Sequence, residues 1–183
     1  MKILILSHND VVELLPMKNC IVLMREALIA LASGEVHQPL RTIIRPPDAA
    51  GVMGLMPSYR SGDRAAFGLK AICVMPGNPA RGKDAHQGAV LLFSADTGEL
   101  QAMMNASAIT AIRTAAASGV ATDLLARENA TKLAIVGTGV QARSHLAAMS
   151  EVRAVSRCRV VSRHFEHATA FTEEMKRNYS FPL

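Results

Sequence analysis

Aromatic residues are scarce in this sequence: tryptophan is absent, and phenylalanine and tyrosine together make up 4% of the 183 residues. Proteins that bind single-stranded nucleic acid stack bases on aromatic side chains, and few are available here. The net charge of +5 comes from basic residues scattered along the chain, with a modest enrichment only in 153–163. We therefore expect no nucleic-acid partner, since an anionic small molecule explains the basic character equally well.

Disulfide, zinc and membrane-spanning motifs are also missing. The three cysteines stand singly in apolar surroundings, so we expect reduced thiols in a cytoplasmic protein. The longest apolar runs, such as residues 89–93, are far shorter than the ~20 residues of a transmembrane helix, so we expect no membrane partner. The apolar run at the N-terminus is too short for a secretory signal and soon meets Asp10. Half of the residues are hydrophobic, which is typical of a globular protein.

The first two thirds of the chain predict helices and antiparallel strands. Asp96-Thr97-Gly98 marks a hairpin turn, and the Gly- and Pro-rich residues 75–88 predict a loop. Small residues over about 107–126 predict a helix with Ser107 as its N-cap. The other expected elements are strands at 3–6, 41–45, 52–56, 66–74, 89–94 and 99–104, a short helix over VVELL and a helix from about Pro16 to Gly34.

From about residue 129 the pattern becomes an alternation of strands and helices, which is typical of a doubly wound parallel sheet. We expect a strand at 132–136, a helix at 140–150, a strand at 158–162 and a helix at 165–177. The predicted fold class is therefore α/β, with an α+β domain at 1–128 followed by the start of a Rossmann-like nucleotide-binding domain at 129–183.

The sharpest motif lies where the first strand of this second domain meets its helix. Residues Gly137-Thr-Gly139-Val-Gln-Ala142 form a GxGxxA fingerprint directly after a buried-strand run. Gly137 permits the tight turn, Gly139 leaves room for a pyrophosphate, and Ala142 lets helix and strand pack closely. Glycine-rich turns also occur as purely structural elements, but the flanking strand and helix favour dinucleotide binding.

The end of the next strand bears on which dinucleotide binds. An acidic residue there would hold the ribose hydroxyls of NAD, whereas an arginine accommodates the 2′-phosphate of NADP. The residues are Ser162-Arg163-His164, and no acid follows until Glu166. We therefore expect NAD(P) as the cofactor, with NADP(H) favoured over NAD(H). The alternative is that Arg163 is an ordinary solvated loop residue.

Three positively charged residues lie in segments where a charge is unusual. Lys70 lies in an almost unbroken apolar run, Arg113 lies among small and apolar helix residues, and Arg41 opens a strand after Pro39. Burying a cation is costly unless it is paired or solvated. A bound carboxylate would pair with the arginines, and a desolvated lysine can exchange protons near neutral pH. The alternative is that these cations reach acids elsewhere or extend to the surface.

Together these motifs resemble the ornithine cyclodeaminase/mu-crystallin family. The resemblance is carried by residues 105–118, with the run ITAIRTAA, and by 133–145, with GTGVQA. Met56-Pro57, Gly68-Leu69-Lys70 and the hairpin from Gly88 to Gly98 also fit, so that it extends over essentially the whole chain. It implies a homodimeric NAD(P)-dependent enzyme acting on small amino or imino acids. The reactions in the family include ornithine cyclodeamination, ketimine or pyrroline-2-carboxylate reduction, and alanine dehydrogenation.

The resemblance also implies roles for parts of the chain. Residues 1–128 match a substrate-binding and dimerisation domain. Arg41, Lys70 and Arg113 match cations that bind the substrate carboxylate, with Lys70 also catalytic beside the reacting carbon. No metal site is implied. The implied cofactor-binding residues are His86, Arg113, Thr114, Gly137, Gly139, Val140, Gln141, Ser162, Arg163 and His164.

Two departures from the family pattern affect these expectations. Asn105 stands where the family usually has an acidic residue, and residues up to Leu183 contain no counterpart of the aspartate that serves as acid/base in cyclodeaminases. The sequence thus resembles a partial family member, and we expect the 183 residues alone to lack turnover. Two other interpretations stay open: a non-catalytic, mu-crystallin-like protein that binds NADPH and a small acid, and an inactive fragment.

Overall fold

The structure is a computed structural model that describes residues 2–183. These residues pack as two compact units. The sheet unit comprises the chain up to Leu15 together with Glu26–Thr110, and the nucleotide-fold unit comprises Pro16–Arg25 together with Ala111–Leu183. Helices α2 (Met17–Ala32) and α3 (Ala106–Leu125) each contribute residues to both units.

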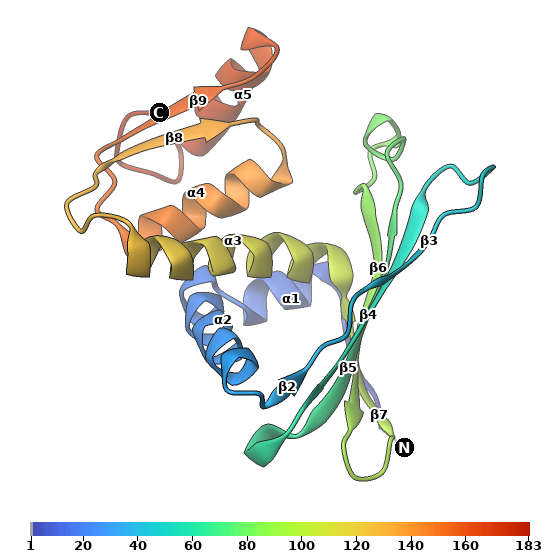
Figure 1. The fold of residues 1–183 in the computed structure, drawn as a ribbon. Coiled ribbons are helices and arrows are strands. Elements are labelled where there is room, and N and C mark those ends of the chain that lie inside the picture. The colour runs from blue at the N-terminus through green and yellow to red at the C-terminus, as the bar shows by residue number, and fades with distance from the viewer. Residues whose placement is uncertain (1) are drawn as a thin grey trace. The chain divides into compact units, whose positions relative to one another are not determined.

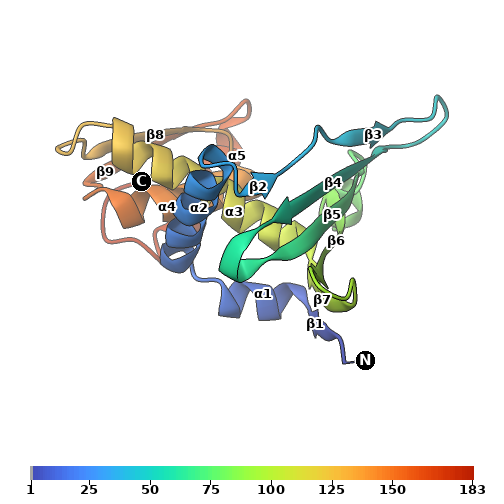
Figure 2. The same cartoon turned by 60° about the horizontal axis from the view of Figure 1, so that its bottom comes forward.

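Within the described residues, a seven-stranded sheet forms the centre of the sheet unit (Figure 1). The strand order is β1-β7-β6-β5-β4-β2, and β3 also pairs with β4. All of these pairs are antiparallel except β1 with β7. Helix α1 (His8–Leu14) packs against β1 and β7 (Figure 2). The strands span Leu4–Leu6 (β1), Val36–His37 (β2), Thr42–Ile44 (β3), Val52–Arg60 (β4), Ala66–Val74 (β5), His86–Ser94 (β6) and Leu100–Asn105 (β7).

The two faces of this sheet differ in burial. Side chains alternate between the faces along each strand, and paired residues share a face. One face carries the buried residues Gly54, Ile72 and Ala102, and Lys70 lies on it. The other face is apolar and open to solvent: its side chains Ile5, Ile44, Met53, Phe67 and Met103 are 37–66% exposed. The buried positions of the sheet therefore lie on one face, although Leu4 and Ile43 at its margins are exposed, and the other face is open to solvent.

Helix α3 starts with a different cap from the one predicted. Oδ1 of Asn105 accepts a hydrogen bond from the backbone N–H of Ala108 at 2.9 Å, so Asn105 is the N-cap and the prediction of Ser107 was wrong. The Ser107 hydroxyl instead donates to Oδ2 of Asp84 at 2.7 Å. A carboxylate oxygen accepts such a bond as an amide oxygen does, so asparagine serves as a cap where the family usually has an acid.

The nucleotide-fold unit begins a parallel sheet with helices at its side (Figure 1). Strands β8 (Lys132–Val136) and β9 (Arg157–Val161) are parallel, joined by α4 (Val140–Val152) and followed by α5 (Phe165–Met175). Both helices bury apolar side chains against one face of the two strands. That core consists of Ile135, Ala142, Leu146, Cys158, Phe171 and Met175, with Leu133, Val160, Tyr179, Phe181 and Leu183 packed around it.

The predicted α/β fold class is confirmed. Most predicted elements occur within a few residues of their expected bounds, but the two-residue strand β2 was missed, and His86 to Gly88 extend β6 where a loop was predicted. The division into functional domains at residue 128 stays a prediction, because the two units are defined by packing alone. None of the helices in residues 2–183 combines the length and hydropathy that a membrane span requires.

Candidate functional site

The loop between β8 and α4 has the geometry that the glycine fingerprint requires. Gly137 has a φ of +110°, a conformation that favours glycine, and its N–H donates to the carbonyl oxygen of Val161 at 2.7 Å. Gly139 is the N-cap of α4, and a β-carbon placed on it would meet only open space. Val140 and Gln141 in the first turn are exposed. The N–H groups at this helix start are therefore accessible to a phosphate.

Parallel pairing brings the segment after β9 to the same edge as this loop. Because β8 and β9 end at paired residues, Gly137 and Ser162 follow their strands at the same level. Ser162 is partly buried, whereas Arg163 and His164 are exposed. His164 is also the N-cap of α5, and its Nδ1 lies 3.8 Å from Oε1 of Glu166. This edge thus combines two helix N-termini with the Arg163 charge, a suitable setting for phosphate groups.

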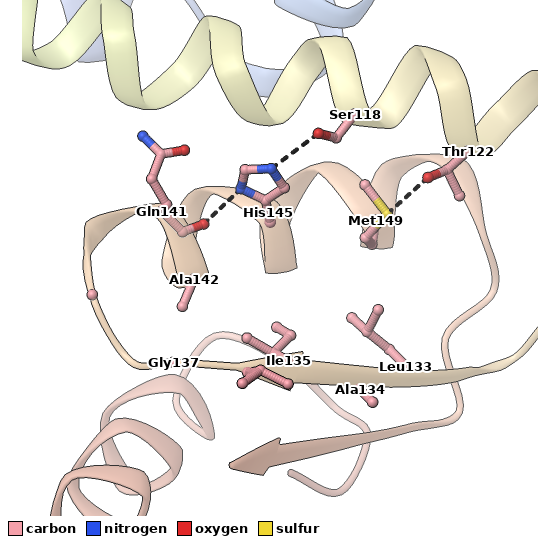
Figure 3. A pocket seen from close by; sticks show the side chains of 12 residues that line it. Ser118, Thr122, Leu133, Ala134, Ile135, Gly137, Gln141, Ala142, His145 and Met149 are labelled. Carbon is pink, nitrogen blue, oxygen red and sulfur yellow. Dashed lines mark hydrogen bonds between the residues drawn. The ribbon is translucent and has the colours of Figure 1, made fainter. Parts of the chain in front are cut away.

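His145 on α4 is held by two hydrogen bonds (Figure 3). Its Nδ1 lies 2.7 Å from the carbonyl oxygen of Gln141, and its Nε2 lies 3.0 Å from Oγ of Ser118 on α3. A carbonyl oxygen only accepts, so Nδ1 of His145 donates its proton to Gln141. These residues line an open pocket of about 500 Å³ along β8. It is lined by Ser118, Thr122, Leu133, Ala134, Ile135, Val136, Gly137, Gly139, Gln141, Ala142, His145 and Met149.

The packing of α3 against α4 also bears on a predicted cofactor residue. One turn beyond the serine–histidine pair, the Thr122 hydroxyl donates to Sδ of Met149 at 3.3 Å (Figure 3). Both pairs are 27 positions apart in the chain. The same spacing, one turn in the other direction, relates Thr114 to Gln141. That these two predicted residues meet beside the glycine loop stays a prediction.

Arg113 precedes Thr114 on α3 and is partly buried. Burial raises the pKa of the Cys20 thiol, and the positive charge of Arg113 opposes that rise. The guanidinium is therefore close enough to Cys20 to act on it electrostatically, within the nucleotide-fold unit.

Lys70 and Arg41 both belong to the sheet unit. Lys70 in β5 pairs with Met56 in β4. Arg41 directly precedes β3, whose first residue Thr42 is opposite Leu55 in β4. Lys70 is partly buried and Arg41 is exposed.

His86 opens β6 and is exposed. It pairs with Val74, four residues from Lys70 on the same face, a separation of roughly 13 Å along the strand. The structure thus groups Arg41, Lys70 and His86 in the sheet unit, and the other predicted residues in the nucleotide-fold unit. Their union in one substrate and cofactor site stays a prediction.

Arg143 lies directly after the fingerprint and was not among the predicted site residues. Its Nη1 donates to the carbonyl oxygen of Thr138 in the glycine loop at 2.8 Å, and its Nε and Nη2 donate to the Glu174 carboxylate. Only the position of Arg143 beside the motif could have drawn attention to it, because Glu174 is 31 residues away. Within residues 2–183, no group of three or more His, Cys, Asp or Glu is arranged to hold a metal ion.

Comparison with known proteins places these features in a family. A model of the ornithine cyclodeaminase/mu-crystallin family matches residues 1–183. A Delta(1)-pyrroline-2-carboxylate reductase of Bacillus cereus is 35% identical over 179 residues, which are 98% of this chain and 55% of that protein. The ketimine reductase mu-crystallin of Mus musculus is 34% identical over 175 residues, or 93% of this chain and 56% of that protein. The chain thus spans about half the length of these curated relatives.

Solved structures of known proteins have the same fold as this chain. The Delta(1)-pyrroline-2-carboxylate reductase of Thermococcus litoralis, in complex with NADH and L-proline, has a TM-score of 0.93 and 37% identity, covering 98% of this chain and 55% of its own. An archaeal alanine dehydrogenase dimer with bound NAD has a TM-score of 0.91 and 28% identity, covering 100% and 56%. A lysine cyclodeaminase that recognises L-lysine and L-ornithine has a TM-score of 0.84 and 32% identity, also covering 100% and 56%.

Proposed function

The chain belongs to the ornithine cyclodeaminase/mu-crystallin family, and on this premise we propose that its protein transfers hydride between NAD(P) and a small imino or amino acid. The observation that carries the proposal is the open glycine loop at the start of α4. Reduction of a cyclic imino acid such as pyrroline-2-carboxylate is the first choice, because relatives at 35% and 37% identity carry that activity in their names. Cyclodeamination, a lyase reaction, and alanine dehydrogenation are the alternatives within this class.

The residues of the nucleotide-fold unit fit a dinucleotide. The open space at Gly139 and the free N–H groups of α4 suit the pyrophosphate, with Thr114, Val140 and Gln141 beside it. At the adjoining edge Ser162, Arg163 and His164 would hold the 2′-phosphate, so we propose NADP(H) over NAD(H). When bound, the nicotinamide supplies or accepts the hydride, and His86 would approach that end.

Three positively charged side chains would bind the substrate and assist the proton transfer. Arg41 and Arg113 would bind the carboxylate through charge-assisted hydrogen bonds, which fix the position of the adjacent carbon. In the reductive direction the carbon of the C=N bond gains a hydride and the nitrogen gains a proton. Lys70 is partly buried on the covered face of the sheet, where an ammonium group can hold that proton and stabilise developing charge.

We also propose a homodimer that uses the open face of the sheet. Apolar side chains on that face, from Ile5 to Met103, are more than a third exposed, and Tyr59 packs on Phe67 there with ring centroids 4.7 Å apart. A second copy would remove this apolar area from water. A cytoplasmic location is proposed because Cys20, Cys73 and Cys158 are free thiols.

The test uses the product of the complete reading frame that carries this sequence. Oxidation of NADPH is followed in the presence of pyrroline-2-carboxylate, and reduction of NADP⁺ with L-alanine. With L-ornithine the release of ammonia is measured, because cyclodeamination returns the hydride to the substrate and leaves the cofactor unchanged. We expect turnover with the imino acid. Cofactor binding without turnover on any of these would favour the non-catalytic binding protein instead. Residues 1–183 on their own are expected to give background rates, because the sheet of β8 and β9 has an open edge and no matched acid is present.

A further inference from the structure

The guanidinium of Arg143 links the glycine loop to helix α5. Its Nη1 donates to the carbonyl oxygen of Thr138 at 2.8 Å, and its other two nitrogens bind the Glu174 carboxylate as a fork. The group also lies over the ring of Phe171, with 5.3 Å from Cζ to the ring centroid. Phe171 is only 1% exposed, so the guanidinium rests on the core of the unit. Its position is therefore fixed from two sides.

The bond to Thr138 determines the direction of a neighbouring N–H group. In a trans peptide the carbonyl oxygen and the following N–H point in opposite directions. With the Thr138 oxygen turned toward Arg143, the N–H of Gly139 points away from it. Among the hydrogen bonds of residues 2–183, none is donated by that N–H, and the space beside Gly139 is open. The N–H is thus held ready for an external acceptor.

We propose that Arg143 is a positioning residue for the cofactor pyrophosphate. It holds the Thr138–Gly139 peptide in the orientation that presents the Gly139 N–H to a phosphate oxygen, and Glu174 keeps the guanidinium in place. The proposal rests on the proposed NAD(P) function. Arg143 acts through the loop, since one N–H on each of its three guanidinium nitrogens is donated to Thr138 or Glu174.

Arg143 would also raise the affinity for the cofactor if its charge simply attracted the phosphates. A variant of Glu174 distinguishes this explanation from the positioning role. Glu174→Gln removes a negative charge near the loop. If Arg143 acted by charge alone, this variant would bind NADPH more tightly. If Arg143 acts by position, the weaker fork loosens the guanidinium, and NADPH affinity falls about two- to threefold.

The experiment measures dissociation constants for NADPH, NADH and adenosine 2′-monophosphate, which lacks a pyrophosphate, using the product of the complete reading frame. Arg143→Met should weaken NADPH and NADH by the same factor, roughly tenfold for a lost charge-assisted bond, and leave adenosine 2′-monophosphate unchanged. Arg127→Met is the matched control, since it removes an exposed arginine that precedes β8, at the strand end opposite the loop. It should leave all three constants unchanged.

A second measurement needs no cofactor. In an amide hydrogen-exchange or ¹⁵N NMR experiment, Arg143→Met should shift the Gly139 amide signal, and Arg127→Met should not. Unchanged NADPH affinity in Arg143→Met, or an equal loss for adenosine 2′-monophosphate, would overturn the positioning role while the proposed function stands. Wild-type protein that binds none of the dinucleotides would overturn the proposed function and the positioning role together.

Discussion

The N–H of Gly137 donates a hydrogen bond of 2.7 Å to the carbonyl oxygen of Val161. This bond joins the ends of β8 and β9, and so it keeps the glycine loop next to the segment that contains Arg163. Residues well separated in the sequence thereby meet at one edge of the parallel sheet. In the proposed complex with NADP(H), this edge would face the pyrophosphate on the 5′ oxygen and the phosphate on the 2′ oxygen of the adenosine.

Cofactor preference should depend on Arg163. Wild-type protein should bind NADPH more tightly than NADH, because an exposed arginine after β9 can pair with the 2′-phosphate. Arg163→Asp should remove or reverse this preference, because its carboxylate repels the phosphate. Titration of both reduced cofactors, followed by their fluorescence, measures the ratio. Equal affinities that the substitution does not change would show that Arg163 is an ordinary loop residue.

Substrate affinity should depend on Arg113. Arg113→Met removes the charge-assisted hydrogen bonds proposed to hold the carboxylate, worth roughly 1.5–3 kcal/mol. This corresponds to a rise in the KM for pyrroline-2-carboxylate of about 10- to 100-fold. Steady-state kinetics at saturating NADPH, together with a thermal melt, separates binding from folding. A large drop in Tm with an unchanged KM would identify Arg113 as a structural residue instead.

The cap of α3 should contribute measurably to stability. Asn105→Ala removes the acceptor for the Ala108 N–H and should lower the free energy of unfolding by about 1 kcal/mol. Asn105→Asp keeps an acceptor at that place and should stay within about 0.5 kcal/mol of wild type. Urea titration followed by circular dichroism measures both variants. The capping role is refuted if the two variants are equally destabilised.

Arg153 should be among the more important polar residues of the nucleotide-fold unit. Its side chain is 9% exposed, and its Nη2 donates to the carbonyl oxygens of Thr122 and Ala126, each at 2.8 Å, at the end of α3. Arg153→Met leaves these carbonyls without that donor and should cost about 2 kcal/mol of unfolding free energy. Arg127→Met, on the exposed surface, should cost less than about 0.5 kcal/mol. Denaturant titration of the two variants measures this difference in unfolding free energy.

Stability in acid should reflect the bond between Arg143 and Glu174. The hydrogen bond from Arg143 lowers the pKa of Glu174 below its ordinary value of 4.5. A carboxyl with a lowered pKa in the folded state stabilises the protein above its ordinary pKa, and this contribution disappears as the pH falls through the folded-state pKa. The Tm difference between wild type and Glu174→Gln should therefore be largest near neutral pH and shrink below pH 4.5. A difference that does not vary with pH would contradict the ion pair.

Local sequence patterns were sufficient for most of the helices and strands and for the glycine loop. The turn at Gly137 needs a positive φ, and the strand and helix around it follow from the spacing of apolar residues over short distances. Such features depend on neighbours in the chain. The apolar surroundings of Lys70 and Arg113 singled out these two cations, and resemblance to the family added Thr114.

Other features required the tertiary structure. Ser107 and Asn105 are both good N-caps by residue type, and only the backbone path selected Asn105, while Ser107 turned to Asp84. Arg143 binds Glu174 across most of α4, the whole of β9 and most of α5. A hydrogen bond within one turn is dictated by adjacent residues. A contact across 31 positions exists only after β8, β9 and α5 have packed around their common core, and no local pattern in the sequence specifies it.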